Sequence, residues 1–266
     1  NDYGINAVGV NGIVVDNLNI YDFGNGIYLD DVSNAEIVNN MIAASGNIEH
    51  GIFLFSASNT RIISNTITTS GTDSYGIYLT GSASNTVSSN TITTSGNTSY
   101  GVYLGVSPNN ILSSNTVTTS GTSSWGIHIS AANNNNLSSN TITTSGADAS
   151  GIFITSSFNN LVYDTNISSL NSNDVRIEGV NGPPPIPSQN TTFLNVTYRL
   201  NNESVESGST LTRQWYLTVN VNDGLNPLNA RLEIYNVNGK LTFSEQTGSD
   251  GISTRFNATQ YIQNSV

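Results

Sequence analysis

The sequence contains no cysteine, so disulfide bonds and thiol chemistry are excluded. Basic residues are scarce as well: seven Lys and Arg stand against 18 Asp and Glu, and the formal net charge is -11. Nucleic-acid binding requires clustered Lys and Arg, so this acidic balance argues against a nucleic-acid partner. No apolar run approaches the length of a transmembrane segment, and none is predicted.

Charged residues make up only 9% of the chain, while Ser, Thr, Asn and Gly are abundant. This composition predicts an extracellular or cell-surface protein. The chain starts at Asn1 and has no signal peptide, so we expect a mature or partial chain. Seven Asn-x-Ser/Thr sequons are candidate glycosylation sites, although several would arise by chance in this composition: Asn97, Asn136, Asn166, Asn190, Asn195, Asn202 and Asn257.

A strict repeat organises the first two thirds of the chain. A Gly followed by Ile or Val recurs every 25 residues, at Gly26, Gly51, Gly76, Gly101, Gly126 and Gly151. Apolar residues recur at fixed offsets from each Gly, with Ser, Thr and Asn between them, and no segment has helical spacing. Each unit therefore contains short strands that can bury their apolar side only by stacking on neighbouring units.

An Asn recurs fourteen residues after each Gly, and this strict position predicts a ladder of stacked side-chain amides. Asn is also a common turn residue, which is the alternative explanation. The ladder residues are Asn40, Asn65, Asn90, Asn115 and Asn140.

The repeat resembles the right-handed parallel β-helices of the pectate-lyase-like superfamily, closest to the repeats shared by carbohydrate-binding proteins and sugar hydrolases. Similar repeats occur in periplasmic copper-binding accessory proteins and in surface proteins. The resemblance covers about residues 4 to 180 and implies a β-helix of about seven coils. It implies no single activity, because this superfamily contains lyases, hydrolases, adhesins and structural proteins.

A Pro-rich stretch from Pro183 to Pro187 is expected to be a stiff linker, so residues 1–182 are assigned to the β-helix. Residues 188–266 show alternating strands and a hairpin signal at Asn238-Gly239, which predict a small β-sandwich. This region resembles carboxypeptidase-regulatory-like or immunoglobulin-like modules. Its last ten residues read as an unfinished strand, so the module is expected to be incomplete or completed by a partner. The predicted fold is thus all-β throughout.

Residues for catalysis are few. No charged residue occurs between Asp73 and Asp148, and only Arg61 and Arg176 are basic before residue 183. Because glycoside hydrolysis needs paired carboxylates, no catalytic residue is assigned. Asp30 and Asp31 could bind calcium, although a solvated acidic turn is favoured.

No metal site or cofactor is predicted. His50 and His128 lie three coils apart, about 14 Å along the stack, and cannot share one metal ion. The resemblance to copper-binding accessory proteins therefore does not extend to a copper site.

An aromatic stripe is the best candidate binding surface. Two residues after each Gly, at a position expected to face outward, stand Tyr28, Phe53, Tyr78, Tyr103, His128 and Phe153. Such a stripe suits sugar-ring stacking or a protein interface, whereas stacking of the rings on one another is the structural explanation.

The function predicted from the sequence is a non-enzymatic building block of a cell-surface layer, stalk or filament. Self-association is expected end to end or through the sandwich. The alternative is a carbohydrate-binding or adhesin module that uses the aromatic stripe to hold cell-surface glycans. A polysaccharide lyase or hydrolase is the third possibility.

Overall fold

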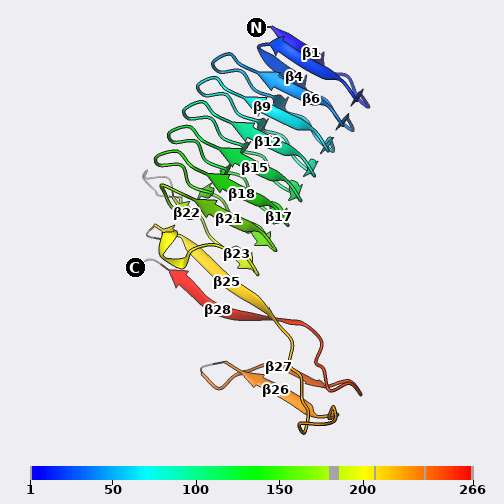
Figure 1. The fold of residues 1–266 in the computed structure, drawn as a ribbon, viewed down its shortest axis with the longest axis vertical. Coiled ribbons are helices and arrows are strands. Elements are labelled where there is room, and N and C mark those ends of the chain that lie inside the picture. The colour runs from blue at the N-terminus through cyan, green and yellow to red at the C-terminus, as the bar shows by residue number, and fades with distance from the viewer. Residues whose placement is uncertain (1, 180–185, 207, 237, 265–266) are drawn as a thin grey trace.

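The computed structural model describes residues 2–179, 186–206, 208–236 and 238–264. It shows a right-handed parallel β-helix of about eight turns, and the only helix among the described residues is the short 3-10 helix η1 (Leu200–Asn202). Three sheets run along the stack (Figure 1). The predicted all-β parallel solenoid is confirmed.

The nine-stranded sheet, here sheet A, begins each coil and includes the repeated Gly-Ile motif. Its strands pair in parallel and in register, so that Ile77 lies between Ile52 and Val102. They are β1 (Tyr3–Val8), β4 (Asn25–Asp30), β7 (Ile52–Phe55), β10 (Ile77–Thr80), β13 (Val102–Gly105), β16 (Ile127–Ser130), β19 (Ile152–Thr155), β22 (Val175–Glu178) and β24 (Glu203–Val205).

The ten-stranded sheet is sheet B. All but its last pair are parallel, and the last strand turns back antiparallel to its neighbour. Its strands are β2 (Val14–Asp16), β5 (Glu36–Val38), β8 (Arg61–Ile63), β11 (Thr86–Ser88), β14 (Ile111–Ser113), β17 (Asn136–Ser138), β20 (Leu161–Tyr163), β23 (Thr191–Leu194), β25 (Thr210–Leu217) and β28 (Phe256–Asn264).

The seven-stranded sheet is sheet C, and its strands face the viewer in Figure 1. Four of them have nearly the same sequence, Thr-Ile-Thr-Thr or Thr-Val-Thr-Thr. The strands are β3 (Asn19–Phe23), β6 (Met41–Ala44), β9 (Thr66–Thr69), β12 (Thr91–Thr94), β15 (Thr116–Thr119), β18 (Thr141–Thr144) and β21 (Asn166–Ser169).

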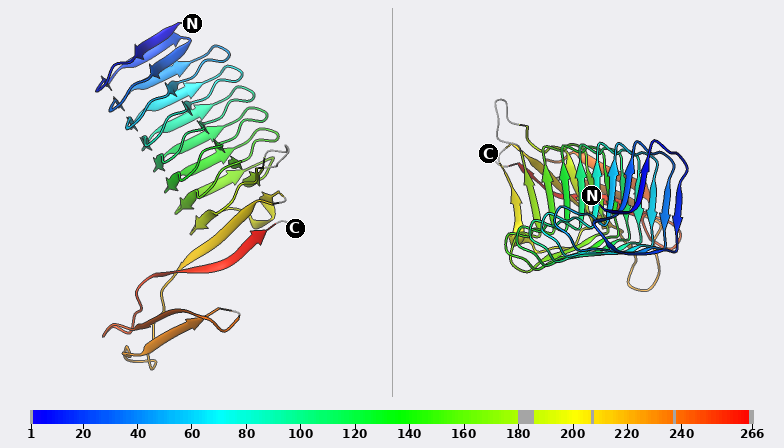
Figure 2. Two further views of the ribbon diagram at one scale, coloured as in Figure 1. Left: turned by 180° about the vertical axis from the view of Figure 1, so that it is seen from behind. Right: turned by 90° about the horizontal axis from the view of Figure 1, so that it is seen from above.

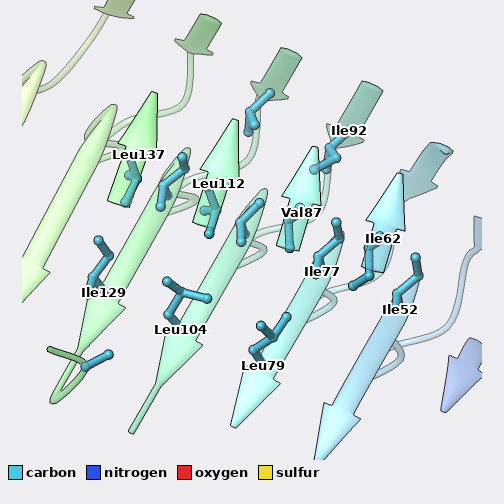
Figure 3. Close-up of a cluster of buried hydrophobic side chains, with 14 of the residues drawn as sticks. Ile52, Ile62, Ile77, Leu79, Val87, Ile92, Leu104, Leu112, Ile129 and Leu137 are labelled. Atoms are coloured by element: carbon cyan, nitrogen blue, oxygen red, sulfur yellow. The ribbon is translucent and has the colours of Figure 1, made fainter. Parts of the chain in front are cut away.

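The core is a set of apolar ladders inside the coils. Ile77 and Leu79 of sheet A, Val87 of sheet B and Ile92 of sheet C are all fully buried and meet inside one coil (Figure 3). Figure 2 shows the coils following one another in the same orientation, and the parallel register places each core residue next to its equivalents on the neighbouring coils. A single coil could not bury these residues alone, which is why the repeat is required.

The predicted Asn ladder is confirmed. Asn90 Oδ1 accepts hydrogen bonds from Asn65 N (2.9 Å) and Asn65 Nδ2 (3.0 Å), and Asn90 Nδ2 donates to the Ile62 carbonyl (2.8 Å). The sequence analysis missed a second Asn ladder. Its residues directly precede the sheet B strands and are Asn85, Asn110, Asn135 and Asn160.

The parallel coils continue past residue 182, where the sequence analysis placed the domain boundary. Strands β23 and β25 extend sheet B, and β24 extends sheet A. Phe193 and Leu211 are buried in the continuing core. Alternating apolar residues occur both in a sandwich strand and in a coil without the 25-residue period, so the pattern alone did not distinguish them.

A C-terminal sandwich is not shown in the part of the chain that the structure describes. After β25, the strands β26 (Arg231–Tyr235) and β27 (Leu241–Gln246) form a two-stranded antiparallel sheet. Asn236 and Gly239 close the predicted hairpin through a backbone hydrogen bond of 2.9 Å. Most of the expected linker, residues 183–185, lies outside the described residues.

Candidate functional site

The outer face of sheet A carries the aromatic residues that the sequence singles out. Together with Tyr3 they form one stack of rings along the helix axis, here called the sheet ladder: Tyr3, Tyr28, Phe53, Tyr78, Tyr103, His128 and Phe153. The residues just before the repeated glycines form a second stack beside it, here called the loop ladder: His50, Tyr75, Tyr100 and Trp125.

Within each ladder, neighbouring rings stack on one another along the helix axis. Phe53 and Tyr78 lie 4.6 Å apart at 3°, and Tyr75 and Tyr100 lie 4.6 Å apart at 7°. The loop ladder contacts the sheet ladder edge to face, as Trp125 does with Phe153 at 4.4 Å and 71°. Inside the stacks the ring faces are therefore covered by neighbouring rings, and a bound sugar would meet mainly edges and hydroxyl groups.

Burial differs along the sheet ladder. Tyr28, Phe53, Tyr78 and Tyr103 are half-buried, whereas His128 and Phe153 are only 8% and 6% exposed. The six predicted residues are thus brought together on one face, but the expected flat, outward-facing surface is a closely packed double ladder. Ring-on-ring stacking, the structural explanation that the sequence analysis left open, is present along both ladders.

Both histidines are buried within these stacks. Burial lowers the pKa of His50 to about 4. Burial, and then the positive charge of Arg176, lower the pKa of His128 to about 3. Both imidazoles are therefore neutral at neutral pH. His50 Nδ1 accepts the Tyr75 N–H at 3.0 Å, and His128 Nε2 lies 3.2 Å from Thr155 Oγ1.

Beside the sheet ladder, the residues at the next outward position of the strands from β4 to β22 are here called together the polar row; most of them are polar, and Phe55 and Gly105 occupy the two other positions. The Tyr28 hydroxyl donates to Asp30 Oδ2 at 3.1 Å. Burial, followed by this hydrogen bond and the Asp30 charge, raises the pKa of Tyr28. The half-buried members of the row are Asp30, Thr80, Ser130, Thr155 and Glu178.

The C-terminal end of the sheet ladder is charged. The Arg176 guanidinium lies over the Phe153 ring at 4.7 Å and also pairs with Glu178. Ile177 pairs with Val205, and Glu206 N donates to the Ile177 carbonyl at 2.8 Å. Glu206 therefore follows the partner of Ile177 and lies beside Glu178 on the neighbouring coil.

Glu178, which pairs with Arg176, and Glu206, whose Oε2 accepts the Gly179 N–H at 3.1 Å, thus follow one another on neighbouring coils at this end of sheet A. Glu178 and Glu206 are both half-buried and lie one strand spacing apart, about 4.8 Å between backbones. The sequence analysis missed this pair because Glu206 lies beyond the 25-residue period. Its only available signal was the spacing of Arg176 and Glu178, which places both on the same face of a strand.

Other predicted residues lie apart from this face or remain untested. The side chains of sequon residues Asn97, Asn166, Asn190 and Asn257 are exposed, and those of Asn136, Asn195 and Asn202 are half-buried. Glycosylation stays a prediction. Asp30 is half-buried and Asp31 is exposed with a φ of 51°. Calcium binding by this pair also stays a prediction.

The sequence matches, over residues 1–198, the family described as periplasmic copper-binding protein (NosD). The chain belongs to this NosD family. Its periplasmic description agrees with the expected location outside the cytoplasm. Among the described residues no helix is long and apolar enough to cross a membrane. A search of curated proteins finds no match.

The residues of this NosD-family chain do not fit a copper site. Copper sites in proteins use His, Cys and Met ligands. The chain has no Cys, and its histidines are stacked among aromatic rings in different coils. Its one methionine, Met41, lies on sheet C beside the Tyr21 hydroxyl. Within residues 2–179 and the later described ranges, no three His, Cys, Asp or Glu side chains cluster.

Solved structures share the fold at low sequence identity. A double mutant of the periplasmic alginate epimerase AlgG has a TM-score of 0.56 and 15% identity, covering 75% of this chain and 49% of that chain. DFA-IIIase from Arthrobacter chlorophenolicus A6, in complex with GF2, has a TM-score of 0.52 and 12% identity, covering 77% and 53%. This chain therefore spans about half the length of those proteins.

These findings correct two expectations from the sequence. A purely structural building block and a non-enzymatic protein were predicted, mainly because the middle coils lack charge. The structures that share this fold are carbohydrate-active enzymes, an epimerase and DFA-IIIase. The uncharged coils were given too much weight, because the charged residues Arg176, Glu178 and Glu206 lie together at the C-terminal end of sheet A.

Proposed function

We propose that this protein binds a polysaccharide along the outer face of sheet A and acts on it at Arg176, Glu178 and Glu206. The observation that carries the proposal is the position of Glu178 and Glu206. They lie side by side on neighbouring coils, next to Arg176 and at the end of the sheet ladder.

The polar row and the exposed ring edges of the sheet ladder form the proposed polysaccharide-binding surface, here called the binding track. Tyr hydroxyls and the side chains of Thr80, Ser130 and Thr155 offer hydrogen bonds to sugar hydroxyl groups. Ring edges and methyl groups supply apolar contact between them. Because the strands are in register, the outward positions recur at one strand spacing per coil, which suits a chain of sugar units rather than a single small molecule.

The charged residues at the C-terminal end of the sheet ladder supply the groups for the reaction. Two neighbouring carboxyl groups can divide the roles of general acid and of base or nucleophile in attack at a glycosidic carbon. Arg176 can hold a substrate carboxylate or stabilise negative charge that develops during the reaction. Its guanidinium is held in place by the Phe153 ring and by Glu178.

The test is an activity screen of the purified chain against alginate and a panel of other acidic and neutral polysaccharides, followed by the variants Glu178→Gln and Glu206→Gln. Each should lower kcat by about 100-fold or more, as expected for loss of a general acid or base. Glu36→Gln is the matched control, because Glu36 also pairs with an arginine, Arg61, but on sheet B. It should leave turnover unchanged.

Binding is tested separately by affinity electrophoresis in gels that contain the polysaccharide. Thr80→Tyr places a large side chain on the binding track and should weaken retardation. Thr86→Tyr introduces the same change on sheet B of the same coil and should not. Absence of binding and turnover across the whole panel, or an equal loss in both Tyr variants, would contradict the proposal.

A further inference from the structure

The outer face of sheet C carries an array of threonines, here called the threonine array. In four successive coils both outward positions of the strand are Thr, and all eight side chains are exposed. The array consists of Thr66 and Thr68, Thr91 and Thr93, Thr116 and Thr118, and Thr141 and Thr143.

The uniformity is specific to this face. In the same four coils, the first outward position of sheet B is occupied by Arg61, Thr86, Ile111 and Asn136. Both faces belong to the same four coils, yet in these coils sheet C keeps one residue type at both outward positions and sheet B does not. Threonine's general preference for strands applies to both sheets, so it does not explain the difference.

The array is regular and stiff. Strands lie about 4.8 Å apart and alternate residues of a strand about 6.7 Å apart, so the hydroxyls form a rectangular lattice. Threonine is stiff at χ1 because its Cβ is branched. Behind the array, Ile92 is fully buried, and the inward Thr94 hydroxyl donates to the Ser99 carbonyl at 2.7 Å. The strands keep one direction from β6 to β21 (Figure 1).

The hydroxyls of the array are available to water. Within the described part of the chain, none of the eight forms a hydrogen bond to another protein group, in contrast to the inward Thr69, Thr94, Thr119 and Thr144. No charged residue occurs between Asp73 and Asp148. Water over the array therefore meets alternating hydroxyl and methyl groups and, within those coils, no ion that would impose its own hydration shell.

We propose that the threonine array is an ice-binding surface. The two spacings of this stiff lattice of hydroxyl groups approximate the repeat distances of oxygen atoms on faces of hexagonal ice, so waters bound to it occupy lattice positions. Crystalline polysaccharide is the competing partner. It is disfavoured because the array offers no aromatic ring, whereas the stacked aromatic rings of these coils lie in the ladders on sheet A.

The experiment measures inhibition of ice recrystallisation and thermal hysteresis by the purified full chain. Wild-type protein should slow the growth of ice grains and should be enriched in slowly grown ice relative to an inert protein of similar size. Thr93→Tyr, in the middle of the array, should raise the concentration needed for inhibition about tenfold, as expected when a central contact of an interface is blocked.

Thr86→Tyr and Thr80→Tyr are matched controls, because they alter the same residue type in the same coil on sheets B and A. Both should inhibit ice growth as the wild type does, and circular dichroism should show the same unfolding midpoint for all three. The proposal is overturned if the wild type does not slow grain growth, or if the three variants behave alike. It is also overturned if Thr93→Tyr abolishes binding to crystalline cellulose or chitin while leaving ice growth unaffected.

This result is independent of the proposed activity on sheet A. Loss of polysaccharide turnover in Glu178→Gln leaves ice inhibition unchanged if both proposals hold, and Thr93→Tyr leaves turnover unchanged. Each proposal can therefore fail without the other.

Discussion

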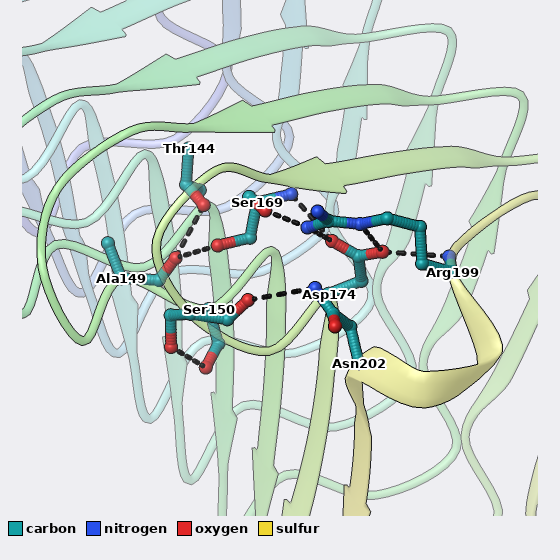
Figure 4. Close-up of polar contacts among 8 residues, drawn as sticks. Thr144, Ala149, Ser150, Ser169, Asp174, Arg199 and Asn202 are labelled. Atoms are coloured by element: carbon teal, nitrogen blue, oxygen red, sulfur yellow. Dashed lines mark hydrogen bonds and ion pairs between the residues drawn. The ribbon is translucent and has the colours of Figure 1, made fainter.

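The fully buried carboxylate of Asp174 is held by the guanidinium of Arg199 (Figure 4). Asp174 Oδ1 accepts from Arg199 Nη2 at 2.8 Å, and Oδ2 accepts from Arg199 Nε at 3.1 Å and from its backbone N–H at 2.8 Å. Ile152 pairs with Val175, so Asp174 stands where the preceding coil has Gly151. Beyond β21, Thr197 forms an isolated parallel bridge with Asn166, and η1 follows it in place of a full sheet C strand.

Arg199→Met should destabilise the fold by about 3 to 5 kcal/mol, because it leaves a buried carboxylate without its partner. Chemical denaturation measures the change. The double variant Asp174→Gly with Arg199→Met should recover part of the loss, since it restores the glycine of the preceding coils. Arg61→Met removes the exposed pair with Glu36 and should cost less than about 1 kcal/mol. Equal costs for both arginines would contradict the buried-charge explanation.

Gly76→Ala should destabilise the β-helix by about 3 kcal/mol through overpacking. A Cβ at this position would lie 2.3 Å from Ile92 Cγ2 and 2.7 Å from the Gly101 carbonyl oxygen, and the backbone cannot move away. Gly105→Ala is the control, because the three atoms nearest to its Cβ would all belong to the Tyr103 side chain, at 3.2 Å. Thermal unfolding followed by circular dichroism should show a much smaller shift for the control.

Asn90→Ala should cost about 2 to 3 kcal/mol, because the buried N–H of Asn65 loses its acceptor. The same substitution at exposed Asn97, whose Oδ1 accepts from Thr122 N at 3.0 Å, leaves a donor that water can reach. Its cost should stay below about 1 kcal/mol. Urea unfolding of the two variants makes the comparison, and a similar loss at both positions would argue against the ladder as the source.

Stability should fall as the pH is lowered from about 6.5 towards 4. The pKa of His50 is about 4 and that of His128 about 3, whereas an unfolded histidine titrates near pH 6.5. The unfolded chain therefore binds more protons in this range, and stability present above pH 6.5 is lost as the pH drops. Each histidine should contribute a loss of about 2 to 3 kcal/mol at pH 4.5.

The variant His128→Phe keeps a ring between Tyr103 and Phe153 but cannot titrate. Denaturant midpoints measured at pH 7 and pH 4.5 should therefore differ less for this variant than for the wild type. If the two proteins lose the same stability on acidification, groups other than His128 control the acid response.

The sequence by itself determined the coil, its register and its core. With a period of 25 residues, parallel stacking places each residue on its equivalent, so Ile52, Ile77 and Val102 must share one ladder, and Asn65 and Asn90 another. The period likewise placed the six aromatic residues on one face.

Only the tertiary structure decided where the coils end and how the rings face. Beyond residue 182 the period is lost, so the pairing of β23 with β20 and the position of Glu206 beside Glu178 depend on packing that no local pattern encodes. The sequence placed the rings outward but could not show that the loop ladder packs against them, because that contact joins residues on two different segments of each coil.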